Sequence, residues 1–271
     1  TDFTIVWWEQ RGAGLSYRSD IPPETMTVQQ LVADTVAVTD YLRKRFGKEK
    51  IYLMGHSWGS FIGIQAAAQA PERYHAYIGV GQITNHLESE RLAYEYMLNE
   101  SSVRGNADMV QKLEAAKFEM TVPLPESYMA LRDEAMHTLG VGTTREMRSV
   151  ISGIFLPTWQ DREYTLREKI NIWRGKWSVY STQLWNQVLL TDITVRLPKL
   201  DVPVYFFQGR YDYTTSYTLA KAYMQQLKAP LKGFYTYEDS AHSPQYEEPE
   251  RTRKILTEDV LKGATYLSDI E

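Results

Sequence analysis

The pentapeptide Gly55-His56-Ser57-Trp58-Gly59 constrains the fold more than any other part of the chain. An apolar run at residues 51–54 precedes it, and an alanine-rich segment that starts near Phe61 and stops before Pro71 follows it. A serine on so sharp a turn must adopt a strained backbone conformation, in which side chains two residues to either side would collide with the chain. The pattern therefore predicts a strand, a tight turn with Ser57 at its tip, and a helix that starts at the serine.

The rest of the chain alternates between strand and helix patterns at both ends. Apolar runs predict strands at 3–8, 51–54, 74–80, 204–207 and 233–237. We expect Thr27 to cap a helix that Gly47 ends, a second helix near 215–227, and a final helix that reaches about residue 261. Strands that alternate with helices are typical of a parallel sheet with crossover helices.

The middle of the chain has a different character. Strand patterns are absent from residue 86 to 198, where helical periodicities dominate at 87–99, 106–118, 126–138 and 164–188. We therefore predict one α/β fold in three parts, a first core segment (1–85), a helical insertion (86–198) and a second core segment (199–271). The first predicted strand stands at the very start of the chain, and we expect N-terminal strands of the sheet to be missing from this sequence.

Composition excludes several classes of protein. Thirty basic against thirty-four acidic residues give a net charge of −4, so we expect no nucleic-acid partner. The sequence has no run of eighteen apolar residues, so we predict no membrane span. No signal-peptide pattern precedes the first predicted strand, and we therefore expect a cytoplasmic protein. The chain has no cysteine and no H-E-x-x-H motif. Gly12-Ala13-Gly14 lacks the third glycine of a dinucleotide fingerprint and the lysine of a P-loop, so we expect neither a metal nor another cofactor.

A nucleophilic serine needs a base, and that base needs an orienting carboxylate. In a parallel-sheet hydrolase these groups follow later strands in the order serine, acid, histidine. Asp212 follows the strand that ends at Phe207, and His242 follows the strand that ends near Tyr237. We therefore predict Ser57 as nucleophile, Asp212 as acid and His242 as base, all at the carboxyl edge of the sheet.

The other histidines and carboxylates are weaker candidates. His56 is expected to point away from the turn, His75 to lie in a strand, and His86 and His137 to belong to the helical insertion. Asp201 precedes its strand, Asp239 is too near His242 in sequence to need long-range placement, and Glu88 is a further possible acid.

Two motifs resemble the α/β-hydrolase fold and, within it, the proline iminopeptidase-like serine hydrolases. Glu9-Gln10-Arg11-Gly12-Ala13-Gly14-Leu15-Ser16 resembles the D-Q-R-G-x-G-x-S loop of that group, with glutamate in place of aspartate. The segment from Gly55 to Ser60 resembles its G-G-S-W-G-S turn, with His56 in place of a glycine. The resemblance implies the same triad, the Trp58 backbone amide as one oxyanion donor, and a helical cap over the site.

The resemblance also implies parts that the sequence lacks. The second oxyanion donor of the group comes from an H-G-G-P-G-type loop ahead of the Q-R-G strand, and no such motif is present. An aminopeptidase needs carboxylates to hold a free α-ammonium group. The position after Trp173, where the resemblance suggests an acid, is Arg174. Acidic residues of the insertion are expected mostly to form a solvated helix face and receive no role: Glu88, Glu90, Glu95 and Glu100.

Trp173 and Trp177, four residues apart, are expected on one helix face. They can either pack between cap and sheet or form the wall of a pocket for a prolyl ring or acyl group.

We expect a cofactor-independent serine hydrolase that releases N-terminal residues, of prolyl type, from short peptides or aminoacyl amides. An esterase or lactonase with the same triad is the first alternative. A binding module with a silent site is the alternative from another class.

Overall fold

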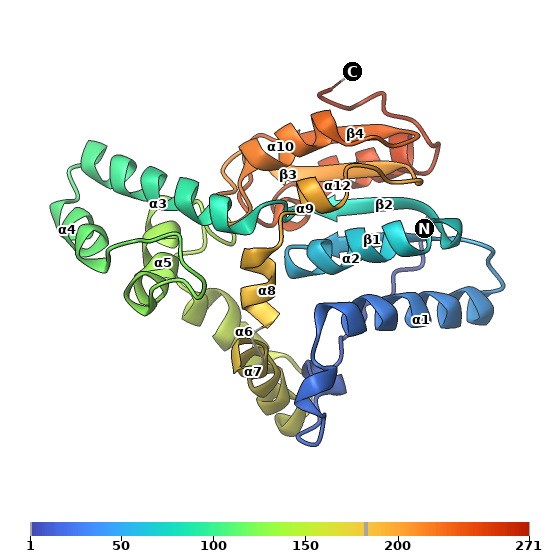
Figure 1. Ribbon diagram of the computed structural model, residues 1–271, viewed down its shortest axis with the longest axis horizontal. Coiled ribbons are helices and arrows are strands. Elements are labelled where there is room, and N and C mark those ends of the chain that lie inside the picture. The colour runs from blue at the N-terminus through green and yellow to red at the C-terminus, as the bar shows by residue number, and fades with distance from the viewer. Residues whose placement is uncertain (1, 182–183, 271) are drawn as a thin grey trace.

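A four-stranded parallel sheet forms the centre of the protein (Figure 1). The computed structural model describes residues 2–181 and 184–270. The strands follow one another across the sheet in chain order, as β1 (Ile51–His56), β2 (Tyr74–Val80), β3 (Val204–Gly209) and β4 (Lys232–Tyr237). All three strand pairs are parallel, which confirms the predicted sheet, and their carboxyl ends lie at one edge.

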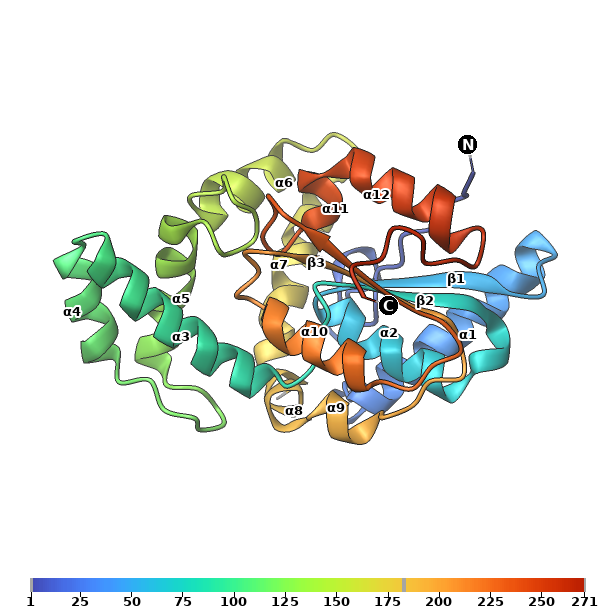
Figure 2. The same ribbon diagram turned by 90° about the horizontal axis from the view of Figure 1, so that it is seen from above.

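Helices cover both faces of this sheet (Figure 2). Alternate side chains of each strand enter different cores, so Tyr77 and Phe206 pack in the cluster that contains α1 (Val28–Phe46), α2 (Trp58–Gln69) and α10 (Tyr217–Gln226). Their neighbours along the strands pack on the opposite face with α12 (Pro249–Ile255) and η5 (Leu256–Val260). This period-two burial on both faces explains why the strand sequences are almost entirely apolar.

Local signals set the bounds of α1. The Thr27 hydroxyl accepts a hydrogen bond from the Gln30 amide at the first turn, and Gly47 ends the helix in the left-handed conformation with φ of 60°. Both ends agree with the prediction, because an N-cap hydroxyl and a C-terminal glycine satisfy backbone groups that the helix itself leaves free. Short helical turns occupy nearby loops: η1 (Gly14–Ser16), η2 (Pro23–Thr25), η3 (Pro71–Arg73) and α11 (Pro244–Glu247).

The chain between β2 and β3 is helical in the described residues, as predicted. It holds α3 (His86–Val103), α4 (Ala107–Ala116), α5 (Glu126–Leu139), η4 (Ile151–Phe155), α6 (Leu156–Gln160), α7 (Leu166–Ser181), α8 (Leu184–Leu190) and α9 (Ile193–Arg196). Helices α3 to α5 extend away from the sheet, whereas α7 runs back to the loop that contains η1 (Figure 1). The last two helices of this stretch, α8 and α9, return the chain to β3.

Three expectations about these elements were incomplete or wrong. Residues 3–8 form no strand, because they do not pair with the edge strand β1, and Ile5 and Trp7 are exposed. The predicted helix at 164–188 is two helices, α7 and α8, and residues 182–183 between them lie outside the described residues. The helical turns at 151–160 were not anticipated. In the described part of the chain, no helix is long and apolar enough to cross a membrane.

Candidate active site

The turn after β1 has the strained geometry that the pentapeptide predicts. Ser57 adopts φ of 54° and ψ of −120°, outside the regions that ordinary residues favour, and helix α2 begins at the next residue. A Cβ at Gly55 would lie 2.3 Å from the backbone oxygen of Gly59, so only glycine fits there. A Cβ at Gly59 itself would meet nothing within 4 Å. The steric argument therefore holds on the β1 side of the serine and fails on the helix side.

The residue after the serine is placed to supply a backbone donor. Trp58 is the first residue of α2, a position whose N–H has no acceptor within its own helix. The Trp58 side chain is held by the loop before η1, since its Nε1 donates a hydrogen bond to Oε1 of Gln10 at 2.8 Å. The positive end of the α2 dipole also lies at this point, so negative charge is stabilised beside Ser57.

His242 and Asp212 form a buried pair at the carboxyl edge of the sheet. His242 Nδ1 lies 2.9 Å from Oδ2 of Asp212, and both side chains are almost completely buried. Because a carboxylate accepts, Nδ1 carries the proton and the lone pair of Nε2 is free to act as a base. Both residues follow strands, Asp212 after β3 and His242 after β4, as predicted.

Asp212 sits in a cage of donors. Gln208 Nε2, the Thr215 amide and the Thr215 hydroxyl donate to its oxygens at 2.8, 2.9 and 2.8 Å. Burial by itself would raise the pKa of Asp212, but the adjacent His242 ring and the hydrogen bonds to the carboxylate outweigh it and hold that pKa below its usual value. The carboxylate therefore stays ionised in the protein interior.

Two contacts bring the Ser57 turn and the His242 ring to the same end of β2. The Ser57 amide donates to the backbone oxygen of Val80 at 2.9 Å. The next residue, Gly81, has φ of 52°, and a Cβ there would lie 2.8 Å from Cε1 of His242. The structure thus places all three predicted residues at one edge of the sheet, with Gly81 directly against the histidine ring.

His56 does not point away from this site, contrary to the prediction. Its Nε2 lies 2.8 Å from the backbone oxygen of His242, and the two rings pack with centroids 4.9 Å apart. Because the carbonyl accepts, His56 carries its proton on Nε2. Burial, with the nearby His242 ring, lowers the pKa of His56 to about 4, so it is neutral near pH 7 and adds no positive charge beside the proposed base.

The other sequence candidates lie elsewhere. Asp201 and Asp239 are exposed, and Asp201 pairs with Lys199. His75 is exposed on β2, and His137 is buried in α5, where Nδ1 contacts the backbone oxygen of Asp133. These side chains therefore have local partners or face solvent, and none contacts the Asp212–His242 pair.

One acidic residue of the insertion is not on a solvated face. Glu90 is fully buried, and Oε2 accepts from Arg132 Nε at 2.7 Å and from the Tyr128 hydroxyl at 2.8 Å. Burial raises the pKa of Glu90, but Arg132 and His86 bring it below its usual value. Glu88, in contrast, pairs with Arg91 near the surface, as a solvated face predicts.

Glu9, the departure from the D-Q-R-G pattern, braces its own loop. Its carboxylate accepts from the Leu15 amide and from the Tyr164 hydroxyl, which links the loop to the segment before α7. Within residues 2–181 and 184–270, no three histidine or acidic side chains are grouped as a metal site requires.

The model of the α/β-hydrolase fold family matches residues 2–249. The chain belongs to this family. The hydrolase is 31% identical to the "Probable aminopeptidase YbaC" of Bacillus subtilis (strain 168) over 249 residues, which is 91% of this chain and 76% of that protein. A relative named proline iminopeptidase, from Heyndrickxia coagulans, is 20% identical and covers 94% of this chain and 80% of its own. The hydrolase is thus proline iminopeptidase-like, as the two sequence motifs indicate.

A solved structure of the proline iminopeptidase of Mycobacterium smegmatis superimposes on the hydrolase with a TM-score of 0.57. It is 16% identical and covers 93% of this chain and 78% of that one. At this identity the likeness shows the fold alone. It therefore carries no information on which bond this hydrolase cleaves.

Sequence reasoning missed three residues of the site in this hydrolase. Gln208 and Thr215 hold Asp212, and His56 holds the backbone of His242. A signal for Gln208 did exist, because a polar residue stands at the end of the otherwise apolar β3. Nothing local marked the other two. His56 and His242 are 186 positions apart in the sequence, and the contact of Thr215 with Asp212 depends on the fold of the loop after β3.

Proposed function

We propose that this hydrolase is a serine hydrolase in which Ser57, His242 and Asp212 act together. The observation that carries the proposal is the buried pair of His242 Nδ1 and Asp212 Oδ2, 2.9 Å apart, beside a strained Ser57 at the start of a helix. This arrangement supplies a nucleophile, a base with a free Nε2 and an ionised orienting group.

In the proposed reaction, Ser57 Oγ forms a bond to the substrate carbonyl carbon while its proton passes to Nε2 of His242. The Trp58 amide and the α2 dipole stabilise the oxyanion, and Asp212 stabilises the imidazolium. The carbon–leaving-group bond then breaks, the leaving group takes the proton from His242, and an acyl-enzyme remains. Water attacks this ester with His242 as base, and Ser57 recovers its proton as the acid product leaves.

For the substrate, we propose release of N-terminal residues, of prolyl type, from short peptides. The Bacillus subtilis relative is named as a probable aminopeptidase, which supports this choice. An esterase or lactonase is the second candidate. One observation favours it, because the position after Trp173, where the resemblance suggests an acid that holds a free α-ammonium group, is Arg174.

The deciding experiment is steady-state hydrolysis of a prolyl-coumarin amide and of a nitrophenyl ester by the full-length protein and by its Ser57→Ala variant. Amide turnover that needs both Ser57 and a free amine supports the aminopeptidase. Ester turnover without amide turnover keeps the triad and rejects the peptidase. If a serine-directed fluorophosphonate fails to label Ser57 in the full-length protein, the enzyme proposal is wrong and a silent binding module takes its place.

A further inference from the structure

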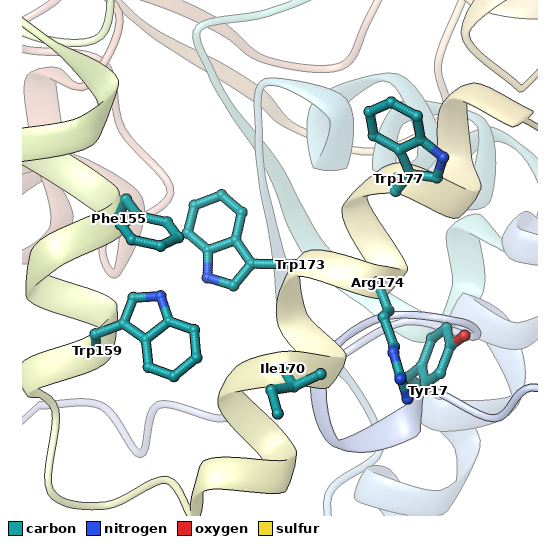
Figure 3. A pocket seen from close by; sticks show the side chains of 7 residues that line it. All are labelled: Tyr17, Phe155, Trp159, Ile170, Trp173, Arg174 and Trp177. Carbon is teal, nitrogen blue, oxygen red and sulfur yellow. The ribbon is translucent and has the colours of Figure 1, made fainter.

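A cavity of about 590 Å³ lies between η4, α6, α7 and the loop around η1 (Figure 3). None of Ser57, Asp212 and His242 lines it. Most of its wall is aromatic, contributed by Tyr17, Phe155, Trp159, Trp173 and Trp177. Trp177 is 78% exposed and lines this cavity, so of the two alternatives for its side chain the structure favours the pocket wall over packing between the insertion and the sheet.

The cavity adjoins the loop around η1, which contacts the Ser57 turn through a hydrogen bond. Helix α7 touches this loop so closely that a Cβ at Gly175 would lie 2.5 Å from the backbone oxygen of Gly12. Two residues earlier, Gln10 accepts the hydrogen bond from Trp58, the residue after Ser57. The cavity is therefore placed to hold a part of a substrate remote from the reacting carbonyl.

The polar groups in this cavity are almost all donors. The Nε1 atoms of Trp159 and Trp173 are buried and have no hydrogen-bond partner in the described structure. Figure 3 shows these two nitrogens on the sides by which the indoles face each other. Arg174 extends toward Tyr17, away from the two indole nitrogens (Figure 3), and can only donate; the Tyr17 hydroxyl is the one lining side-chain group that can also accept. The exposed Arg174 guanidinium is a donor that a ligand can reach, so this wall favours a ligand that brings acceptor oxygens.

Positive charge gathers at the same wall. Among the described residues, no carboxylate lies within ion-pair distance of Arg174, and no lining residue is acidic. The Lys176 ammonium lies 5.7 Å from the centre of the Trp173 ring. Lys169 donates to the backbone oxygen of Trp159 at 2.8 Å.

We propose that this cavity binds an apolar or aromatic group that carries a carboxylate. The rings stack on the apolar body, and Arg174 pairs with the carboxylate oxygens. An ammonium group finds no anionic partner there and is repelled. The proposal rests on the hydrolase function proposed above and names its substrate class. The carboxylate belongs either to the C-terminal residue of a short peptide, on the leaving side, or to the acyl part of a dicarboxylic monoester.

Binding is tested first, without turnover. Tryptophan fluorescence is titrated with 3-phenylpropionate and with its uncharged analogue, 3-phenylpropionamide. We expect the acid to bind about tenfold more tightly than the amide. Arg174→Gln removes this preference. Arg167→Gln makes the same charge change on α7 outside the cavity and keeps the full preference. Equal binding of acid and amide, or equal losses in Arg174→Gln and Arg167→Gln, overturns the proposal.

Turnover then identifies which side of the substrate carries the carboxylate. We compare kcat/KM for the dipeptide Pro-Phe with that for Pro-Phe-amide, and for 4-nitrophenyl hydrogen glutarate with that for its methyl ester. A preference of about tenfold for the acid in one pair, lost in Arg174→Gln and kept in Arg167→Gln, assigns the carboxylate to that side. Absence of the preference in both pairs, with normal turnover, refutes the substrate role. If neither pair is hydrolysed but Arg174-dependent binding persists, the proposed hydrolase function fails and the carboxylate site stands.

Discussion

Gly81→Ala tests whether His242 acts from the position in which the structure holds it. The added Cβ would lie 2.8 Å from Cε1 and 2.9 Å from Nδ1 of the ring, against 3.4 Å or more in an ordinary contact. The ring must therefore shift by about 0.6 Å, which stretches its 2.9 Å hydrogen bond to Asp212. Because a misplacement of about 1 Å can cost about a hundredfold, we expect this shift to lower kcat/KM by about tenfold. The left-handed backbone at φ of 52° costs a further 1–2 kcal/mol or so of stability for alanine.

Gly47→Ala separates these two effects. Gly47 has φ of 60°, and a Cβ there would meet nothing within 4 Å, so alanine meets the backbone cost without a clash. We expect Gly81→Ala to lose more stability than Gly47→Ala, measured as the shift in denaturant midpoint, because the clash adds to the backbone cost, and only Gly81→Ala to lose ester or amide turnover. If Gly81→Ala keeps more than half of the activity of Gly47→Ala, either His242 is not the base or its ring need not stay in the described position for activity.

Three further outcomes are expected. Asp212→Asn should lower kcat by about 10³–10⁴-fold, because an amide can hold the wrong tautomer of the histidine; near-normal kcat for either substrate would contradict the assignment. Glu90→Gln should destabilise the protein by about 3 kcal/mol, since it leaves Arg132 buried without its anion; in denaturant unfolding, Glu90→Gln with Arg132→Met should lose less than the sum of the single changes. Burial holds the pKa of His56 and of His86 at about 4, below the value of about 6.5 in an unfolded chain. The unfolded chain therefore takes up protons first, and stability should fall as the pH drops from about 6.5 to 4, by about 2 kcal/mol per histidine at pH 5. Equal unfolding free energies at pH 7 and pH 5 would refute this.

Local sequence patterns determined the order of strands and helices and the place of the serine turn. Apolar runs predicted β1 to β4, Thr27 and Gly47 marked the ends of α1, and Gly55 beside Ser57 marked the strained turn. These features depend on residues close together in the chain, on which propensity, capping and steric rules act directly. The order serine, acid, histidine at strand ends predicted the Asp212–His242 pair for a different reason, because a parallel sheet brings the ends of its strands to one edge.

Only the tertiary structure decided what each polar side chain meets. His56 supports His242 across 186 positions of sequence, and Glu90 is buried on Arg132 rather than solvated. The run at 3–8 has the composition of a strand but forms none, because composition does not itself supply the backbone pairing that makes a strand. Trp173 and Trp177 likewise share a face of α7, but the sequence of α7 alone does not determine which other segments lie against that face. Burial, pairing and pKa are properties of neighbours, and neighbours distant in sequence are chosen by the packing of the whole chain.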